Sequence, residues 1–139
     1  THNLVNNMTL NKRIEIANRL RAQGLNCSQC VAMAFPDIHK LPDEIMAKLS
    51  IGFGGGVGGQ GEVCGVVSGM AIIEGFRSEG SAQDKRMVYP RVSNLPEIFK
   101  SKHGSIICRE LKGMTPPRPC NDLILNGIEI LHNFINETK

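Results

Sequence analysis

Cysteine is the residue type through which this sequence most clearly offers chemistry. A thiolate can attack a disulfide, transfer electrons or ligate a metal, so cysteines that converge in a fold indicate redox or metal chemistry. The chain of 139 residues has five of them, which are Cys27, Cys30, Cys64, Cys108 and Cys120. Residues 27–30 form a C-x-x-C motif, which can close a disulfide across one helical turn or supply two metal ligands. One such motif is a weak signal, and core packing is the more ordinary role for Cys30.

Four of the cysteines occupy equivalent positions, each in the first turn of an expected helix. They are Cys27, Cys64, Cys108 and Cys120. The positive end of a helix dipole favours a thiolate there by about 0.3–1 kcal/mol, and by up to about 2 kcal/mol in a partly buried geometry. Because one pKa unit corresponds to about 1.4 kcal/mol, a single dipole lowers a thiol pKa by about a unit at most. A larger shift needs converging helix ends, a metal, or a cation such as Arg109 or Arg118.

A glycine-rich block precedes Cys64. Eight of the fifteen residues from 51 to 65 are glycine. The block contains overlapping G-x-G-x-x-G matches, but no strand precedes it, so dinucleotide binding is not expected and NAD is not the expected cofactor. We expect instead a loop that brings backbone N–H groups toward Cys64, or toward an anion or cofactor beside it. The glycines assigned to this role are Gly54, Gly55, Gly56 and Gly61. Such open backbone predicts that Cys64 is the more accessible thiol.

The histidines suggest no further site. His39, His103 and His132 are isolated in the sequence, and none has a second histidine at metal-ligand spacing. Because His103 lies near Cys108 in sequence, a Cys–His nucleophile pair stays open as a less favoured interpretation.

The first third of the chain has clear helix boundaries. Thr9 can cap an amphipathic helix whose solvated polar face includes Arg13. Asn26 and Gln29 have the spacing of a capping box for a buried second helix, which Pro36 ends. These signals predict two helices joined by a short turn.

The rest of the chain also has helical periodicity, and no segment shows the strict alternation of a half-buried strand. A third helix that begins at residues 41–44 is expected to turn Ile45, Met46 and Leu49 inward. Pro90 and Pro96 predict a broken helix, or two short ones, between residues 87 and 102. The other helices are expected over residues 63–76, 105–111 and about 120–136. The sequence therefore predicts an all-α fold, a compact bundle of about six or seven helices with the glycine-rich loop before a central buried helix.

Composition limits the class of protein. The net charge of +3 is mild, and one Tyr with no Trp offers few stacking aromatics, so nucleic-acid binding is not expected. No run of about 18 apolar residues or signal-peptide pattern occurs, and the cysteines are expected to be reduced or metal-bound in the cytoplasm. We expect a single helical domain over residues 1–139, with residues 1–8 flexible. Gly65 and Gly69 could serve a homodimer contact or internal packing, and both remain open.

Six short motifs, taken in order, carry a family resemblance. They are residues 26–29, 52–56, 61–69, 104–105 and 108–111, and Cys120. In this order they resemble the C_GCAxxG_C_C family of redox-active proteins, over about residues 17–131. The resemblance implies a small redox protein whose site is Cys27, Cys64, Cys108 and Cys120, and related domains beside redox cofactors make an iron–sulfur cluster one option. The sequence departs from the family pattern at Val66 and at Cys30, and the extra thiol of Cys30 could compete for pairing with Cys27.

The leading hypothesis is a thiol-redox or electron-transfer protein, and an oxidoreductase activity stays open. In it the four cysteines form a redox-active disulfide, or hold zinc or an iron–sulfur cluster, and the electron partner is a protein or a small molecule. The first alternative is a non-enzymatic metal-binding or sensor domain with a structural four-thiolate site. The second is a helical binding module whose cysteines only pack.

Overall fold

The protein folds into helices joined by short loops. A computed structural model describes residues 8–138, and these contain eight α-helices and no strand. The helices are α1 (Leu10–Ala22), α2 (Cys27–Met33), α3 (Pro36–His39), α4 (Asp43–Ser50), α5 (Gly65–Gly75), α6 (Lys85–His103), α7 (Cys108–Lys112) and α8 (Cys120–Glu137). The predicted all-α class is confirmed, and six of these helices have seven or more residues. The segment expected to be flexible, residues 1–8, lies outside the described residues except for Met8.

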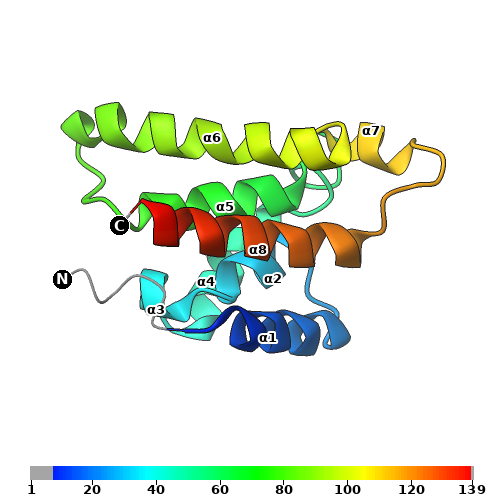
Figure 1. The fold of residues 1–139 in the computed structure, drawn as a ribbon. Coiled ribbons are helices and arrows are strands. Elements are labelled where there is room, and N and C mark those ends of the chain that lie inside the picture. Colours follow the sequence, from blue (N-terminus) through cyan, green and yellow to red (C-terminus); the bar gives the residue numbers. More distant parts are fainter. Residues whose placement is uncertain (1–7, 139) are drawn as a thin grey trace.

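The helices pack in layers around α5 (Figure 1). Helix α6 lies along one side of α5 and α8, and α1, α2 and α4 lie on the opposite side, with α2 packed closely against α5. Helix α5 is the central buried helix that the sequence predicts, since Val66, Met70 and Ile73 are fully buried. Its buried side chains belong to one core cluster with Val31 of α2 and Leu131 of α8, which are also fully buried.

The first two helices begin at the residues that the sequence indicates. Thr9 Oγ1 accepts a hydrogen bond of 3.1 Å from the Lys12 backbone N–H. At the start of α2, Asn26 Oδ1 accepts from the Gln29 N–H at 3.0 Å, and Gln29 Oε1 accepts from the Asn26 N–H at 2.9 Å. The predicted capping box is therefore present, and it fixes the start of the helix that carries Cys27.

The predicted break between residues 87 and 102 is wrong. Helix α6 runs without interruption through Pro90 and Pro96. A proline removes one hydrogen bond to the carbonyl four residues earlier, but α6 lies at the surface, where water can bond that carbonyl (Figure 1). Leu95 and Phe99, one helical turn apart, are buried against the core and hold the helix in place. Tertiary packing therefore outweighs the local cost of the prolines.

Two expectations about side-chain direction are also wrong. Ile45 and Leu49 are 44% and 42% exposed, whereas Met46 is fully buried. Helix α4 has only eight residues and buries a single stripe, Met46 and Ser50, which are four positions apart. Arg13, expected on the solvated face of α1, is also fully buried.

None of the helices within residues 8–138 is long and apolar enough to span a membrane.

Candidate functional site

Four cysteines stand at the starts of four helices. Cys27, Cys108 and Cys120 are the first residues of α2, α7 and α8, and Cys64 is the residue just before α5. The sequence predicted each of them in the first turn of a helix. The structure confirms this for Cys27, Cys108 and Cys120, and places Cys64 one residue earlier, as the N-cap of α5. Each cysteine therefore lies at a helix N-terminus, where the backbone N–H groups have no hydrogen-bond partner within the helix.

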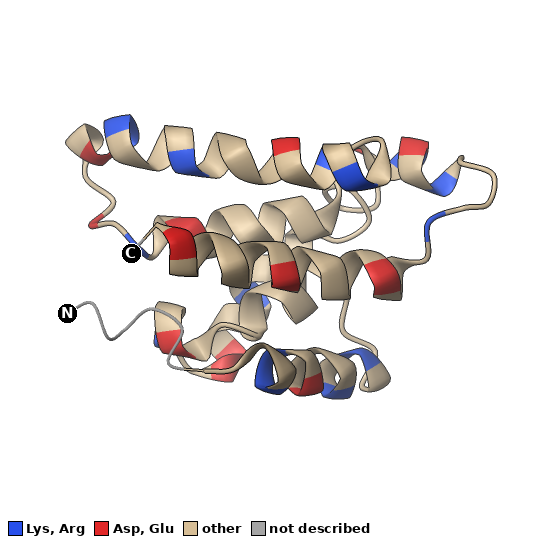
Figure 2. Ribbon diagram, viewed as in Figure 1, with Lys and Arg blue, Asp and Glu red and all other residues tan. Residues whose placement is uncertain are grey.

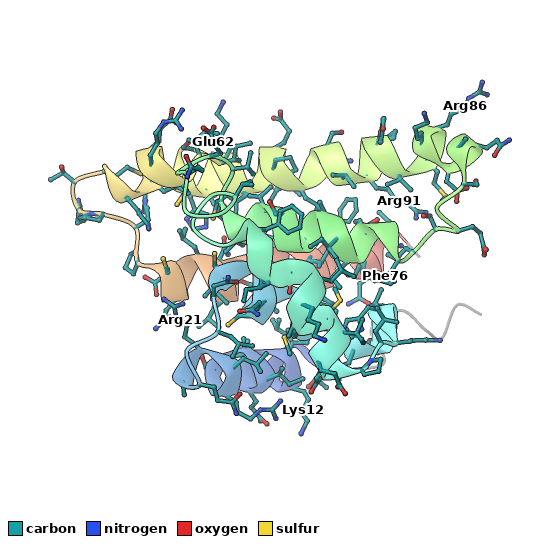
Figure 3. All side chains as sticks on the ribbon, turned by 180° about the vertical axis from the view of Figure 1, so that it is seen from behind. Lys12, Arg21, Glu62, Phe76, Arg86 and Arg91 are labelled. Carbon is teal, nitrogen blue, oxygen red and sulfur yellow. The ribbon has the colours of Figure 1, made fainter. Side chains whose placement is uncertain are left out.

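The same four cysteines line one cavity of about 220 Å³. They come from segments that are far apart in the sequence, so the fold brings them together. The remaining lining residues are Arg21, Asn26, Gly55, Gly65, Val66, Leu111, Lys112, Arg118 and Leu123. Cys30 is fully buried and does not line the cavity. In Figure 3, Arg21 and Glu62 lie toward the same end of the molecule, opposite the end at which α6 carries Arg86.

A short backbone ladder holds Cys64 and Cys108 beside each other. Val63 and Ile107 form an isolated antiparallel bridge. On its two sides the Cys64 N–H donates to the Ile106 carbonyl at 2.7 Å, and the Cys108 N–H donates to the Glu62 carbonyl at 2.6 Å. The bridge therefore fixes the start of α5 against the start of α7.

Close packing of α2 on α5 sets Cys27 against the start of α5. A side chain on Gly65 would collide with Cys27 Sγ, and the position of its Cβ would lie 3.0 Å from the Phe53 carbonyl oxygen. One turn later, a Cβ on Gly69 would lie 3.0 Å from Val31 Cβ. Gly65 and Gly69 thus face α2, so internal packing explains this pair of small residues.

The glycine-rich loop closes mainly on itself. The Gly54 N–H donates to the Ile51 carbonyl at 3.3 Å, and the Gly61 N–H donates to the Gly55 carbonyl at 3.0 Å. Neither group is therefore free for an anion. Gly56 has φ +77°, and a Cβ there would collide with the backbone of Glu62. Of the four glycines proposed as a binding backbone, only Gly55 lines the cavity.

The thiols differ in exposure. Cys64 and Cys108 are 5% and 8% exposed, whereas Cys27 and Cys120 are half-buried. The expectation that Cys64 is the more accessible thiol is therefore wrong. Backbone N–H groups of the glycine-rich loop donate to carbonyl groups within the same loop, so they do not open a path to Cys64. In addition, α2 covers the start of α5.

Burial also decides the protonation of Cys64. It raises the pKa of the Cys64 thiol from 9.0 to about 11, although the backbone N–H groups of Val66 and Val67 act in the opposite direction. The neighbouring Cys27 and Cys108 raise this pKa further. The helix start alone is thus too weak to give a thiolate here, as its expected contribution of about one pKa unit implies. Burial likewise raises the pKa of Cys30 to about 11.

Three cations and no acidic side chain line the cavity. They are Arg21, Lys112 and Arg118. Figure 2 shows basic residues at the end of α1, at the end of α7 and in the α7–α8 connection, on one side of the molecule. Of the two cations that the sequence suggested, Arg118 lines the cavity, whereas Arg109 points elsewhere and pairs with Glu62 at 3.4 Å. Arg21 and Lys112 were not suggested, because no local pattern links them to the cysteines.

No metal centre is formed by the side chains described. Within residues 8–138, no three His, Cys, Asp or Glu side chains are grouped so that they could hold a metal ion. The four thiols as arranged thus do not fit a four-thiolate zinc or iron–sulfur site. All five cysteines are free thiols. His103 bonds Asn126 Oδ1 at 2.6 Å and does not line the cavity, which gives no support to a Cys–His pair.

Comparisons with known proteins agree with the sequence resemblance. A family model with the description "Putative redox-active protein (C_GCAxxG_C_C)" matches residues 25–134, well over half of the chain. An uncharacterized protein of Archaeoglobus fulgidus is 23% identical, in an alignment that covers 92% of this chain and 93% of the relative. No solved structure gives a significant match.

Proposed function

Because the chain belongs to the C_GCAxxG_C_C family, we propose that it is a thiol-redox protein that cycles Cys27 and Cys64 between two thiols and a disulfide. One observation carries the proposal. Four cysteines from four helix starts line a single cavity, and all four are free thiols. The family description supports a redox role in general terms, and the cavity suggests which residues perform it.

Cys27 is the proposed attacking thiol. It is half-buried and lines the cavity, so a substrate can reach it. Its sulfur also packs against Gly65, the residue next to Cys64. Exposure combined with a neighbouring second thiol is what an attacking cysteine in disulfide exchange requires.

Cys64 is the proposed resolving thiol. Burial keeps it protonated near neutral pH, so it does not compete with Cys27 for an incoming disulfide. Once Cys27 is joined to half of the substrate, Cys64 attacks the Cys27 sulfur and releases that half. Two protein thiols thereby lose two electrons and two protons, and the substrate disulfide gains them as two thiols.

Cys108 and Cys120 are proposed as a second pair that restores the first. The backbone bridge holds Cys108 beside Cys64, and Cys120 is half-buried at the same cavity. Exchange between the two pairs would move the disulfide toward Cys120, where an external reductant can reach it. No step requires a bound metal.

A redox titration tests this proposal. Anaerobically reduced protein is equilibrated with dithiothreitol buffers of graded potential, and its free thiols are counted by alkylation and intact-mass analysis. We expect a reversible two-electron transition in which Cys27 and Cys64 lose their thiols together. Cys27→Ser should abolish this transition and leave only that of the Cys108–Cys120 pair, and Cys30→Ser, the matched control from the same helix, should retain it. If all five thiols stay reduced across the range while the fold is intact, the proposal is wrong.

A further inference from the structure

The charges around the thiol cavity are unbalanced. Arg21, Lys112 and Arg118 line it, and no Asp or Glu does. Arg21 bonds the Asn121 side chain at 3.0 Å, and Arg118 Nε contacts Met114 Sδ at 3.5 Å. Neither contact neutralises a charge, so the cavity carries a net positive potential.

Two longer helices add to this potential. Helices α5 and α8 have eleven and eighteen residues, and their N-termini reach the cavity through Cys64 and Cys120. Partial positive charge at such helix ends favours anions. The helix ends and the three cations therefore act in the same direction.

The size of the cavity limits what it can hold. Its volume of about 220 Å³ is below the range of roughly 300–1,000 Å³ that is usual for drug-sized ligands. Apart from the cations, the sulfurs and the amide side chain of Asn26, the side chains of the lining are apolar, with Val66, Leu111 and Leu123 among them. Such a space suits part of a small molecule with a short apolar body and a charged end.

From these features we propose that the cavity takes a small disulfide with carboxylate groups, whose negative charge is held by Arg21, Lys112 and Arg118. This inference rests on the proposed thiol-redox function and names the substrate class of the same site. The carboxylates face the cations while the disulfide sulfurs face Cys27. Electrostatic attraction of this kind raises the rate of encounter and weakens as salt is added.

The reaction of such a substrate balances without another reactant. Cys27 loses its proton to water, and its sulfur attacks one sulfur of the disulfide, which breaks the S–S bond and releases one carboxylate-bearing thiolate. Cys64 then loses its proton to water, and its sulfur attacks the Cys27 sulfur, which breaks the mixed S–S bond and frees the second thiolate. The two released thiolates take up two protons, so the protein loses two electrons and the substrate gains two.

The test compares three small disulfides of different charge. Reduced protein is mixed with 3,3′-dithiodipropionate, which is anionic, with 2-hydroxyethyl disulfide, which is neutral, and with cystamine, which is cationic. Each rate is divided by the rate at which a neutral small thiol attacks the same disulfide, which corrects for leaving-group differences. We expect the normalised rate for the anion to exceed that for the neutral compound by about tenfold at low salt. The excess should shrink as ionic strength approaches 0.15 M, where the Debye length is about 8 Å.

A pair of variants isolates the cations. Lys112→Gln with Arg118→Gln should lower the anion-to-neutral rate ratio by about fivefold. The ratio also corrects for any change in thiol reactivity that the lost charges cause. The charge-matched control is Lys85→Gln with Arg86→Gln, at the far end of α6 (Figure 3), and it should leave the ratio unchanged.

The outcomes separate this inference from the function on which it rests. If no disulfide reacts faster with the protein than with the reference thiol, the proposed function fails. If all three react fast with equal normalised rates, or cystamine reacts fastest, the function stands and the anionic substrate class is wrong. An equal fall of the ratio in both double variants would also overturn the role of Lys112 and Arg118, because it would reflect net charge alone.

Discussion

The sulfur of Cys27 occupies the space beside Gly65 that a side chain at this position would fill. Gly65 is the first residue of α5 and follows Cys64, so this contact brings Cys27 next to Cys64. The absence of a side chain at Gly65 is thus part of the cysteine site.

Gly65→Ala should therefore damage both packing and redox behaviour. The new methyl group would collide with Cys27 Sγ and lie close to the Phe53 carbonyl oxygen. We expect a loss of about 1–3 kcal/mol in the free energy of unfolding, the usual cost of overpacking. Urea unfolding measures it, and the two-electron transition should weaken in parallel.

Gly75→Ala is the matched control at the other end of α5. A Cβ at Gly75 meets nothing within 4 Å, and Gly75 lies in the same helix. The substitution should be neutral or stabilise by up to about 1 kcal/mol, because alanine is the better helix former. Equal effects of the two substitutions would rule out the packing argument.

The raised pKa of Cys64 predicts how stability and labelling depend on pH. The folded value is about 11 against 9.0 unfolded, so the unfolded chain loses its proton first as the pH rises. The contribution to stability is complete below about pH 9 and is lost as the pH approaches 11. Cys64→Ser should reduce the fall in unfolding free energy across this window, and Cys30, with a similarly raised pKa, accounts for part of the remainder.

Iodoacetamide labelling, mapped by peptide mass spectrometry, gives a second reading of the same group. In folded, reduced protein the labelling of Cys64 should rise through about pH 11, and in urea it should rise near pH 9. Rapid labelling of Cys64 in the folded protein at pH 7 would contradict its burial.

Arg13 should be a large contributor to stability. It is fully buried, donates to both carboxylate oxygens of Asp37 at 2.8 and 2.9 Å, and bonds the Ala34 carbonyl at 2.9 Å. Arg13→Ala would leave the Asp37 charge without this partner, at a cost of about 3–5 kcal/mol. Lys12→Ala, which removes an exposed ion pair of 3.8 Å with Glu15, should cost less than about 1 kcal/mol. Thermal or urea unfolding that ranks the two variants the other way would refute this assignment.

Features set by nearby residues could be predicted from the sequence. The caps at Thr9 and Asn26 involve partners three positions away, so their spacing alone reveals them. The positions of the cysteines at helix starts follow from the same boundaries. These local rules gave the all-α class and the four candidate cysteines.

Features set by packing could not be predicted in this way. The burial of Arg13 depends on Asp37 and His132, which lie in other segments of the chain. The cations Arg21 and Lys112 reach the cavity only once α1 and α7 are placed around it. The same holds for Cys64. The glycine-rich segment before it suggests an exposed thiol, but packing of α2 against α5 buries it. In each of these examples, contacts between residues far apart in the sequence decide where the side chain lies.

The most direct test of the account is the identity of the first disulfide. Reduced Cys30→Ser protein is treated with one equivalent of diamide, its remaining thiols are blocked, and a tryptic digest is mapped by mass spectrometry. Cys27 and Cys64 fall in separate tryptic peptides, residues 22–40 and 49–77, so their disulfide appears as one linked mass. We predict this linked pair as the main product. Disulfides formed only between protein molecules, or a first product that lacks Cys27 or Cys64, would contradict the account.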